Sequence, residues 1–213
     1  MYSLRFFNPS FYLWQAYLFL PPYANSSAMT RYLIAALPPE SIAEPIWAYK
    51  RYVAEHYGSV RGLRVLPHIT YVSPFTLSEK VPISSLAQQL ESFLGSFQAE
   101  TIQLTDFGYF STNRGHVIYV AVEKTERMEQ QYLTLDAFVR ESLQVSLPPI
   151  HSVFTPHLTI AYRDLSRRQF EQAWPYFEQE SFSARMPLDA LWLLQHTGKQ
   201  WEPLRKFDFA SNA

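Results

Sequence analysis

A four-residue motif that occurs twice limits the folds open to this chain more than any other feature. Pro-His-Ile-Thr stands at residues 67–70, and Pro-His-Leu-Thr stands at residues 156–159. A segment with the apolar spacing of a helix comes before each copy. An internal repeat of this kind predicts two similar lobes that face each other.

Apolar periodicity predicts strands and helices that alternate along the chain. Pro45 suits the first turns of the first helix, Gly58 suits its end, and Ser166 is a candidate cap for the last helix. Two pairs of strands are adjacent in sequence, so the order indicates an α+β class with mostly antiparallel sheets and not a doubly wound parallel sheet. The expected strands span residues 32–37, 67–73, 101–110, 116–122, 156–162, 188–196 and 201–209, and the expected helices span residues 40–57, 84–97, 127–143 and 166–178.

The composition is that of a globular protein with a small ligand. Hydrophobic residues make up 47% of the 213 residues and charged residues 17%. The formal net charge is −1, whereas a protein that follows a long duplex usually carries a basic stripe. The chain has no cysteine, which excludes disulfides, a thiol nucleophile and a cysteine zinc site. The charge balance therefore favours a small ligand or the end of one RNA strand over a long duplex. We also expect a monomeric, cytoplasmic protein with no membrane partner.

Residues 1–28 differ from the rest of the chain. Their apolar run, residues 11–20, is shorter than the roughly 18 residues of a membrane span. One interpretation is an N-terminal extension outside the domain, with Met29 as the natural start. The other is a secretion signal with Ser26 and Ala28 at its cleavage site. In either case we expect residues 29–213 to form one domain.

The spacing within each motif has a chemical meaning. Residues two apart in a strand point to the same face, so His68 lies beside Thr70 and His157 beside Thr159. Across a cleft, one histidine can take a proton from a nucleophile while the other gives a proton to a leaving oxygen. The threonine hydroxyls can donate to the non-bridging oxygens of a phosphoryl group. The pair of motifs therefore indicates phosphoryl chemistry.

Other interpretations of the histidines stay open. Each motif histidine, taken alone, can equally be a structural residue near a strand edge. Two histidines can also ligate a metal, but neither motif has a third ligand at a suitable spacing. We therefore expect no metal and no cofactor. His196, at the end of a strand in the last hairpin, either borders the cleft or is structural.

These residues resemble the 2H phosphoesterase superfamily, also called the 2′-5′ RNA ligase family, which includes RNA 2′,3′-cyclic phosphodiesterases. The resemblance covers residues 29–209, from the first strand with its Leu-Pro-Pro-Glu ending, through both motifs, to Trp-Glu-Pro-Leu at residues 201–204. It implies a bilobal fold of two pseudo-symmetric lobes with helices outside and the active site between the lobes.

The resemblance also implies roles for the motif residues. The first histidine, His68, would protonate the leaving 3′ oxygen, and the second, His157, would activate water. Thr70 and Thr159 would bind the phosphate. A 2′,3′-cyclic end of an RNA, or a small cyclic nucleotide, would then give a 2′-phosphate.

The chain departs from this family next to the second motif. Several relatives have an arginine five residues after the second histidine, where this chain has Tyr162, followed by Arg163. Arg163 shares strand parity with the motif, so it either turns toward the phosphate or pairs with Asp164 in a loop. Aromatic side chains near the motifs either stack on a base or belong to the core; they are Tyr71, Phe75, Tyr119 and Tyr162.

Three functions are compatible with the sequence. The first is a metal-independent cyclic phosphodiesterase, active in excess chelator, with a bell-shaped pH profile whose limbs lie on either side of neutrality. The second is 2′-5′ RNA ligation, the reverse reaction, or hydrolysis of another cyclic nucleotide. The third is a module that binds an RNA end or a phosphate without turnover.

Overall fold

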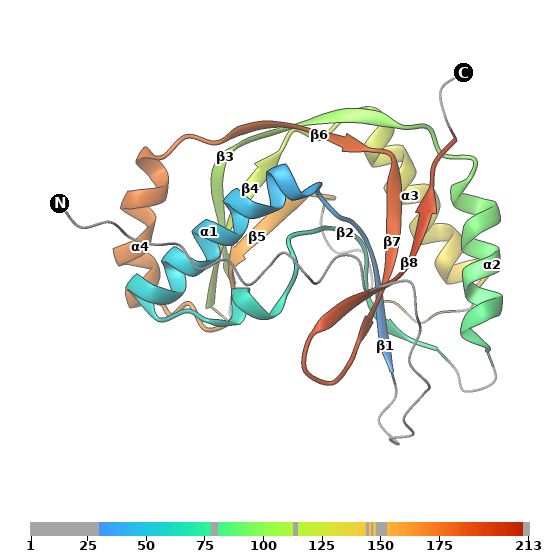
Figure 1. Ribbon diagram of the computed structural model, residues 1–213, viewed down its shortest axis with the longest axis horizontal. Helices are drawn as coiled ribbons and strands as arrows, with labels where there is room; N and C mark the ends of the chain where they lie inside the picture. The colour runs from blue at the N-terminus through green and yellow to red at the C-terminus, as the bar shows by residue number, and fades with distance from the viewer. Residues whose placement is uncertain are drawn as a thin grey trace, which may run out of the picture.

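The computed structural model describes residues 30–77, 81–112, 115–143, 145, 147 and 153–210. Within this part of the chain, two four-stranded antiparallel sheets form the centre of the molecule (Figure 1). The first sheet has the order β2-β1-β7-β8 and consists of β1 (Arg31–Ala36), β2 (Ile69–Thr76), β7 (Ala190–His196) and β8 (Trp201–Asp208). The second has the order β5-β4-β3-β6 and consists of β3 (Glu100–Thr112), β4 (Gly115–Val122), β5 (His157–Ala161) and β6 (Ser183–Leu188).

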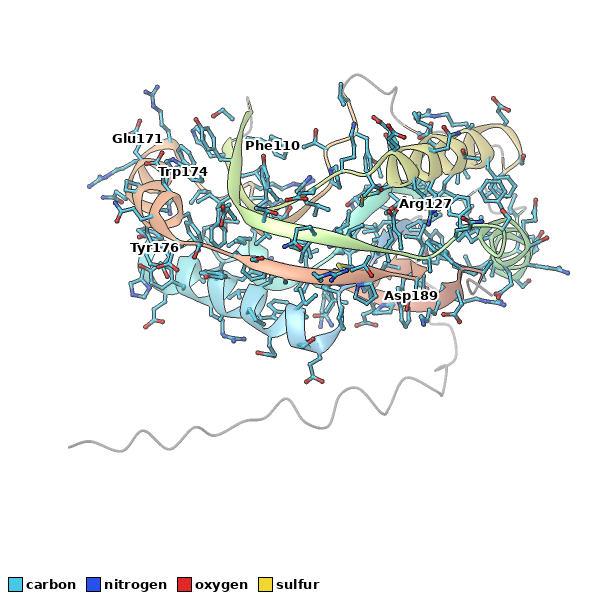
Figure 2. The ribbon with its side chains drawn as sticks, turned by 90° about the horizontal axis from the view of Figure 1, so that it is seen from above. Phe110, Arg127, Glu171, Trp174, Tyr176 and Asp189 are labelled. Carbon is cyan, nitrogen blue, oxygen red and sulfur yellow. The ribbon has the colours of Figure 1, made fainter. Side chains whose placement is uncertain are left out.

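Two helices lie at each end of the molecule (Figure 1). Figure 2, seen from above, shows Glu171, Trp174 and Tyr176 of α4 at one end and Asp189 toward the other. The helix at residues 40–57 connects β1 and β2 of the first sheet but contacts β5 of the second. The helix at residues 126–141 connects β4 and β5 of the second sheet but contacts β2 of the first. Each sheet is therefore covered by a helix whose neighbouring strands belong to the other sheet. The helical segments are α1 (Glu40–Tyr57), the 3-10 helix η2 (Arg61–Arg64), α2 (Ile83–Leu94), α3 (Glu126–Glu141) and α4 (Arg167–Gln179).

The helix ends follow from local chemistry, as the sequence predicts. Pro45 lies in the early turns of α1, and Gly58 ends this helix in the left-handed conformation with a φ of 72°. Ser166 accepts a hydrogen bond from the backbone N–H of Gln169, and Gln169 reaches back to form a capping box. The predicted helices are thereby confirmed to within a few residues.

One strand was not predicted. The strand expected over residues 188–196 is present as β7, which begins two residues later, but β6 before it was missed, and Asp189 separates the two strands, which belong to different sheets. Strand β6 was missed because Pro187 and Arg185 interrupt the apolar alternation. Proline is tolerated there because β6 is an edge strand, where an absent N–H leaves no ladder bond unmade.

Most buried side chains of the two sheets form one continuous hydrophobic cluster, and Leu33, Ala35 and Leu194 of the first sheet form a second, smaller one. Ile34 and Ile69 enter the larger cluster from the first sheet, and Val120 and Leu158 enter it from the second, each with no exposed surface. The two lobes therefore share a core. None of the described helices is long and apolar enough to cross a membrane. The predicted extension, residues 1–28, lies outside the described residues.

Candidate active site between the lobes

The two motifs lie on strands that meet between the lobes. The first motif leads into β2 and the second opens β5, and these are edge strands of different sheets that contact each other. Burial alternates in the same way in both motifs, with Ile69 and Leu158 fully buried and the histidines and threonines half-buried. The alternation predicted for the two strands is thus present, and the aliphatic residue of each motif anchors it in the core.

Both histidines make the same hydrogen bond. His68 Nδ1 lies 2.7 Å from the carbonyl oxygen of Leu66, and His157 Nδ1 lies 2.8 Å from the carbonyl oxygen of Thr155. A carbonyl oxygen only accepts, so Nδ1 carries the hydrogen in each ring. In the neutral imidazole this leaves Nε2 with its lone pair, ready to take or return a proton. Two equivalent backbone contacts, one in each lobe, therefore set the same tautomer.

The surroundings of the motif histidines favour the neutral form of both rings. Burial lowers the pKa of His68 from 6.5 to about 4; the hydrogen bond to Leu66 opposes this, while Lys50 and His157 add to the lowering. Burial also lowers the pKa of His157, against the effect of its hydrogen bond to Thr155. His157 is among the charged groups that lower the pKa of His68, so the two rings lie within electrostatic range of each other.

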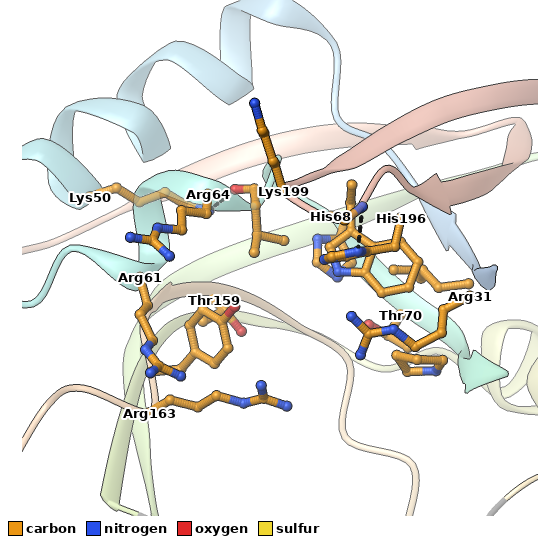
Figure 3. Close-up of a pocket in the computed structure, with 16 residues that line it drawn as sticks. Arg31, Lys50, Arg61, Arg64, His68, Thr70, Thr159, Arg163, His196 and Lys199 are labelled. Atoms are coloured by element: carbon orange, nitrogen blue, oxygen red, sulfur yellow. Dashed lines mark hydrogen bonds between the residues drawn. The ribbon is translucent and has the colours of Figure 1, made fainter. Parts of the chain in front are cut away.

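A cleft of about 390 Å³ lies between the lobes (Figure 3). Its walls come from β1, β2 and the β7–β8 hairpin on one side and from α1, η2 and the end of β5 on the other. Aspartate and glutamate are absent from the described lining, which is rich in basic side chains. The lining residues are Arg31, Leu33, Lys50, Arg61, Arg64, Val65, His68, Thr70, Pro74, Thr159, Tyr162, Arg163, His196, Gly198, Lys199 and Trp201.

The cleft brings together most of the predicted site residues. His68, Thr70, Thr159, Arg163 and Tyr162 all line it. His157 is not among the residues that line it, although Thr159 of the same strand is, and the rings of Tyr119 and Phe110 pack against its imidazole with centroid distances of 5.1 Å. Tyr119 thus flanks the second histidine without lining the cleft.

Two predicted stacking residues belong elsewhere. Tyr71 is 1% exposed and Phe75 is 3% exposed, and both lie in the hydrophobic core. Tyr71 packs against Phe154, and Phe75 packs against Tyr32. Their position in β2 turns them to the core face, away from Thr70. Of the two interpretations open for Tyr71 and Phe75, the structure therefore supports the core and not base stacking.

Arg163 reaches the cleft by a route that the sequence did not predict. Strand β5 ends at Ala161, and Arg163 has a φ of 65°, so strand parity does not place its side chain. It lies over the ring of Tyr162, with its guanidinium carbon 5.6 Å from the ring centroid. The alternative ion pair with Asp164 does not form, because that carboxylate is occupied by Ser59 Oγ and the backbone N–H groups of Val60 and Arg61.

A buried lysine supports the loop before the first motif. Lys50 of α1 is 2% exposed, and its ammonium group donates to the carbonyl oxygens of Gly62 and Val65. It also lies over the ring of Trp47, 4.8 Å from the centroid. Burial lowers the pKa of Lys50 to about 7. The sequence offered a signal for this residue, because Lys50 interrupts the apolar stripe of α1 that contains Ile46 and Val53.

Four further cationic residues of the cleft were not identified from the sequence. Arg31 is the first residue of β1, Arg61 and Arg64 lie on η2, and Lys199 lies in the last turn. They come from separate segments with no common spacing, so only the fold brings them together. His196, which was open to either interpretation, lines the cleft. Among the described residues, no three His, Cys, Asp or Glu side chains gather as a metal site would require.

The comparisons with known proteins agree with this geometry. A family model described as the 2′-5′ RNA ligase superfamily matches residues 38–200, which is more than half of the chain. The chain belongs to this superfamily. No curated protein matches it in sequence. The resemblance to 2H phosphoesterases expected from the two motifs is thereby confirmed at the level of the family.

Solved structures share the fold of this superfamily member. TT0787 of Thermus thermophilus gives a TM-score of 0.58 at 18% identity, covering 86% of this chain and 100% of that one. LigT of E. coli complexed with 3′-AMP gives a TM-score of 0.56 at 19% identity, covering 85% of this chain and 99% of that one. The predicted bilobal α+β class is confirmed by these similarities and by the two sheets.

Proposed function

We propose that this protein is a metal-independent phosphodiesterase that opens a 2′,3′-cyclic phosphate, at an RNA end or on a small nucleotide, to a 2′-phosphate. The observation that carries the proposal is the matched pair of histidines. Each has its Nδ1–H bound to the carbonyl two residues before it, so each is set to exchange a proton at Nε2. Binding alone would need donors but not two opposed titrating groups.

The reaction uses one histidine on each side of the phosphorus. His157, in its neutral form, takes a proton from water at Nε2 as the water oxygen bonds to phosphorus. The bond between phosphorus and the 3′ oxygen breaks, and His68, protonated at Nε2, gives its proton to that oxygen. The products are a 2′-phosphate and a free 3′ hydroxyl, and solvent exchange returns both rings to their starting states.

The remaining residues bind the charge of the phosphoryl group. The hydroxyls of Thr70 and Thr159 donate to non-bridging oxygens, and Arg163 supplies a positive charge at the end of β5. An anionic ligand stabilises the protonated imidazole, which counters the lowering of the His68 pKa by burial. A nucleotide ligand also agrees with the structures of E. coli LigT, which were solved with 3′-AMP and with ATP.

The test is hydrolysis of 2′,3′-cyclic AMP in excess EDTA, with the two nucleotide products separated by chromatography. The proposal predicts turnover in EDTA and 2′-AMP as the product. Activity only after addition of a divalent metal, or 3′-AMP as the product, contradicts it. If the wild-type protein binds the cyclic nucleotide and releases no product, the binding-module alternative holds instead.

A further inference from the structure

The cleft holds more positive charge than the reacting phosphate requires. A cyclic phosphodiester carries one negative charge, yet six lysine and arginine side chains line the cleft. Elsewhere on the described surface, six basic side chains form ion pairs with carboxylates: Arg51, Lys124, Arg140, Arg167, Arg205 and Lys206. The other three described basic residues outside the cleft, Arg127, Arg168 and Arg185, lie on three different elements and do not form a cluster. The net charge of the chain is only −1, so the gathering of basic side chains in the cleft is local. It indicates a ligand with more negative charge than the reacting phosphate alone.

Two of the excess charges lie together on η2. Arg61 and Arg64 have exposed side chains that line the cleft, and neither forms an ion pair with a residue that the structure describes. In Figure 3 both lie on the same side as Lys50, away from Arg31. They therefore flank the motif threonines on one side.

The segment that carries these arginines is held by side chains of α1 and of the turn after β5. At its start, Asp164 accepts hydrogen bonds of 2.9 and 3.0 Å from the backbone N–H groups of Val60 and Arg61. In its middle and at its end, Lys50 holds the carbonyl oxygens of Gly62 and Val65. The carboxylate of Asp164 is thus used by backbone donors and not by the two guanidinium groups. Because the backbone of this segment is already fixed, binding an anion requires ordering only the two arginine side chains.

We propose that Arg61 and Arg64 form a second phosphate subsite, which binds a phosphate on the 5′ oxygen of the nucleoside whose cyclic phosphate reacts. The chemistry of the substrate selects this position. In a nucleoside 2′,3′-cyclic phosphate, the 2′ and 3′ oxygens are both in the reacting group. The 5′ oxygen is the remaining ribose oxygen that can carry a second phosphate. The inference rests on the proposed function, because that function defines which phosphate reacts.

Two sources supply a phosphate at this position. In an oligonucleotide it is the next phosphodiester of the strand, and in a mononucleotide it is a 5′-monophosphate. Three substrates separate these sources: adenosine 2′,3′-cyclic phosphate, its 5′-phosphorylated form, and the dinucleotide ApA with a 2′,3′-cyclic end. The measured quantity is kcat/KM for each, in EDTA and at fixed salt.

The expected result is a kcat/KM about tenfold or more higher for a substrate with the 5′-phosphate than for the substrate without it. In the double variant R61Q/R64Q the ratio falls to about one, and in R61K/R64K it is partly retained because the charge remains. Arg51→Gln is the matched control, since Arg51 lies outside the cleft lining and pairs with Glu44. A gain for the 5′-phosphorylated mononucleotide assigns the subsite to any 5′-phosphate, and a gain for the dinucleotide alone assigns it to a continuing strand.

A wild-type ratio of about one, or a ratio that the double variant leaves unchanged, overturns the inference. Failure of the proposed function gives a different result, because none of the three substrates is then turned over. Calorimetric binding of adenosine 2′,5′-bisphosphate and of 2′-AMP then measures the subsite without turnover. Tighter binding of the bisphosphate by wild type, lost in R61Q/R64Q, supports the subsite, and equal binding of the two ligands refutes it.

Discussion

Replacement of Gly62 by alanine should damage the active site through the packing of η2 on β5. A Cβ atom at this position would lie 2.2 Å from the carbonyl oxygen of Ile160 and 3.4 Å from its carbonyl carbon. Carbon and oxygen atoms that are not bonded seldom approach closer than about 3.3 Å. The two backbones must therefore separate by about 1 Å. Ile160 follows Thr159 directly, so the separation moves either the phosphate-binding strand or the arginines of η2.

The magnitude of this effect follows from the size of the shift. Overpacking of this kind lowers the free energy of unfolding by about 1–3 kcal/mol. A displacement of about 1 Å at a catalytic group can lower kcat/KM by about 100-fold. Urea denaturation measures the first quantity, and hydrolysis of 2′,3′-cyclic AMP measures the second.

Gly198 provides the matched control for this substitution. It lines the same cleft, but a Cβ atom there meets nothing within 4 Å, and its φ is 93°. Gly198→Ala should therefore lose about 1–2 kcal/mol through backbone strain alone and keep its kcat/KM within a few-fold. If Gly62→Ala is as stable as wild type and retains its kcat/KM, the packing argument is refuted.

Three further predictions concern pH and the support of the cleft. The pKa values of His68 and His157 are both lowered, so the base His157 becomes neutral, and the acid His68 loses its proton, at a lower pH than free histidine. The value of kcat/KM should therefore peak below pH 6.5. A maximum above pH 7 in a pH–rate profile would contradict this. Above about pH 7 the buried Lys50 of the folded protein releases its proton, whereas the same lysine in the unfolded chain keeps it. The unfolded state then binds more protons, so the free energy of unfolding should rise by about 1–2 kcal/mol between about pH 7 and 9. The rise should vanish in Lys50→Met, and a rise that persists in this variant would assign it to another group. Asp164→Ala should lower the free energy of unfolding by about 3 kcal/mol because three donors lose a charged acceptor, whereas Asp208→Ala, at an exposed ion pair, should lower it by less than about 1 kcal/mol; equal losses in urea denaturation would refute the role of Asp164.

The elements that the sequence predicted well are those whose signals are local. The cap of α4 at Ser166 and the end of α1 at Gly58 depend on a few neighbouring residues, so both could be located from sequence. Strand β6 could not, because an edge strand tolerates Pro187 and exposed polar side chains, and its identity depends on pairing with β3.

The residues of the candidate site also fall into those with a local sequence signal and those that only the fold brings together. The motif pairs could be recognised because spacing by two fixes the face of a strand. The position of Arg163 could not, because a left-handed residue after β5 breaks strand parity. The cation cluster was also hidden, since the net charge averages over the whole chain while the cleft collects arginines and lysines from distant segments. The expected pH profile around neutrality likewise shifts to lower pH, because burial of the histidines is a property of the fold.

The central claim is that His68 and His157 act together on one phosphodiester. The most direct test measures hydrolysis of 2′,3′-cyclic AMP in excess EDTA by wild type, His68→Ala, His157→Ala and the double variant, with thermal unfolding to establish that each is folded. The account predicts that each folded single variant loses a factor of about 10²–10⁴ in kcat and that the double variant loses little more, because residues that act as a unit are not additive. A folded single variant that retains activity close to wild type would contradict the account.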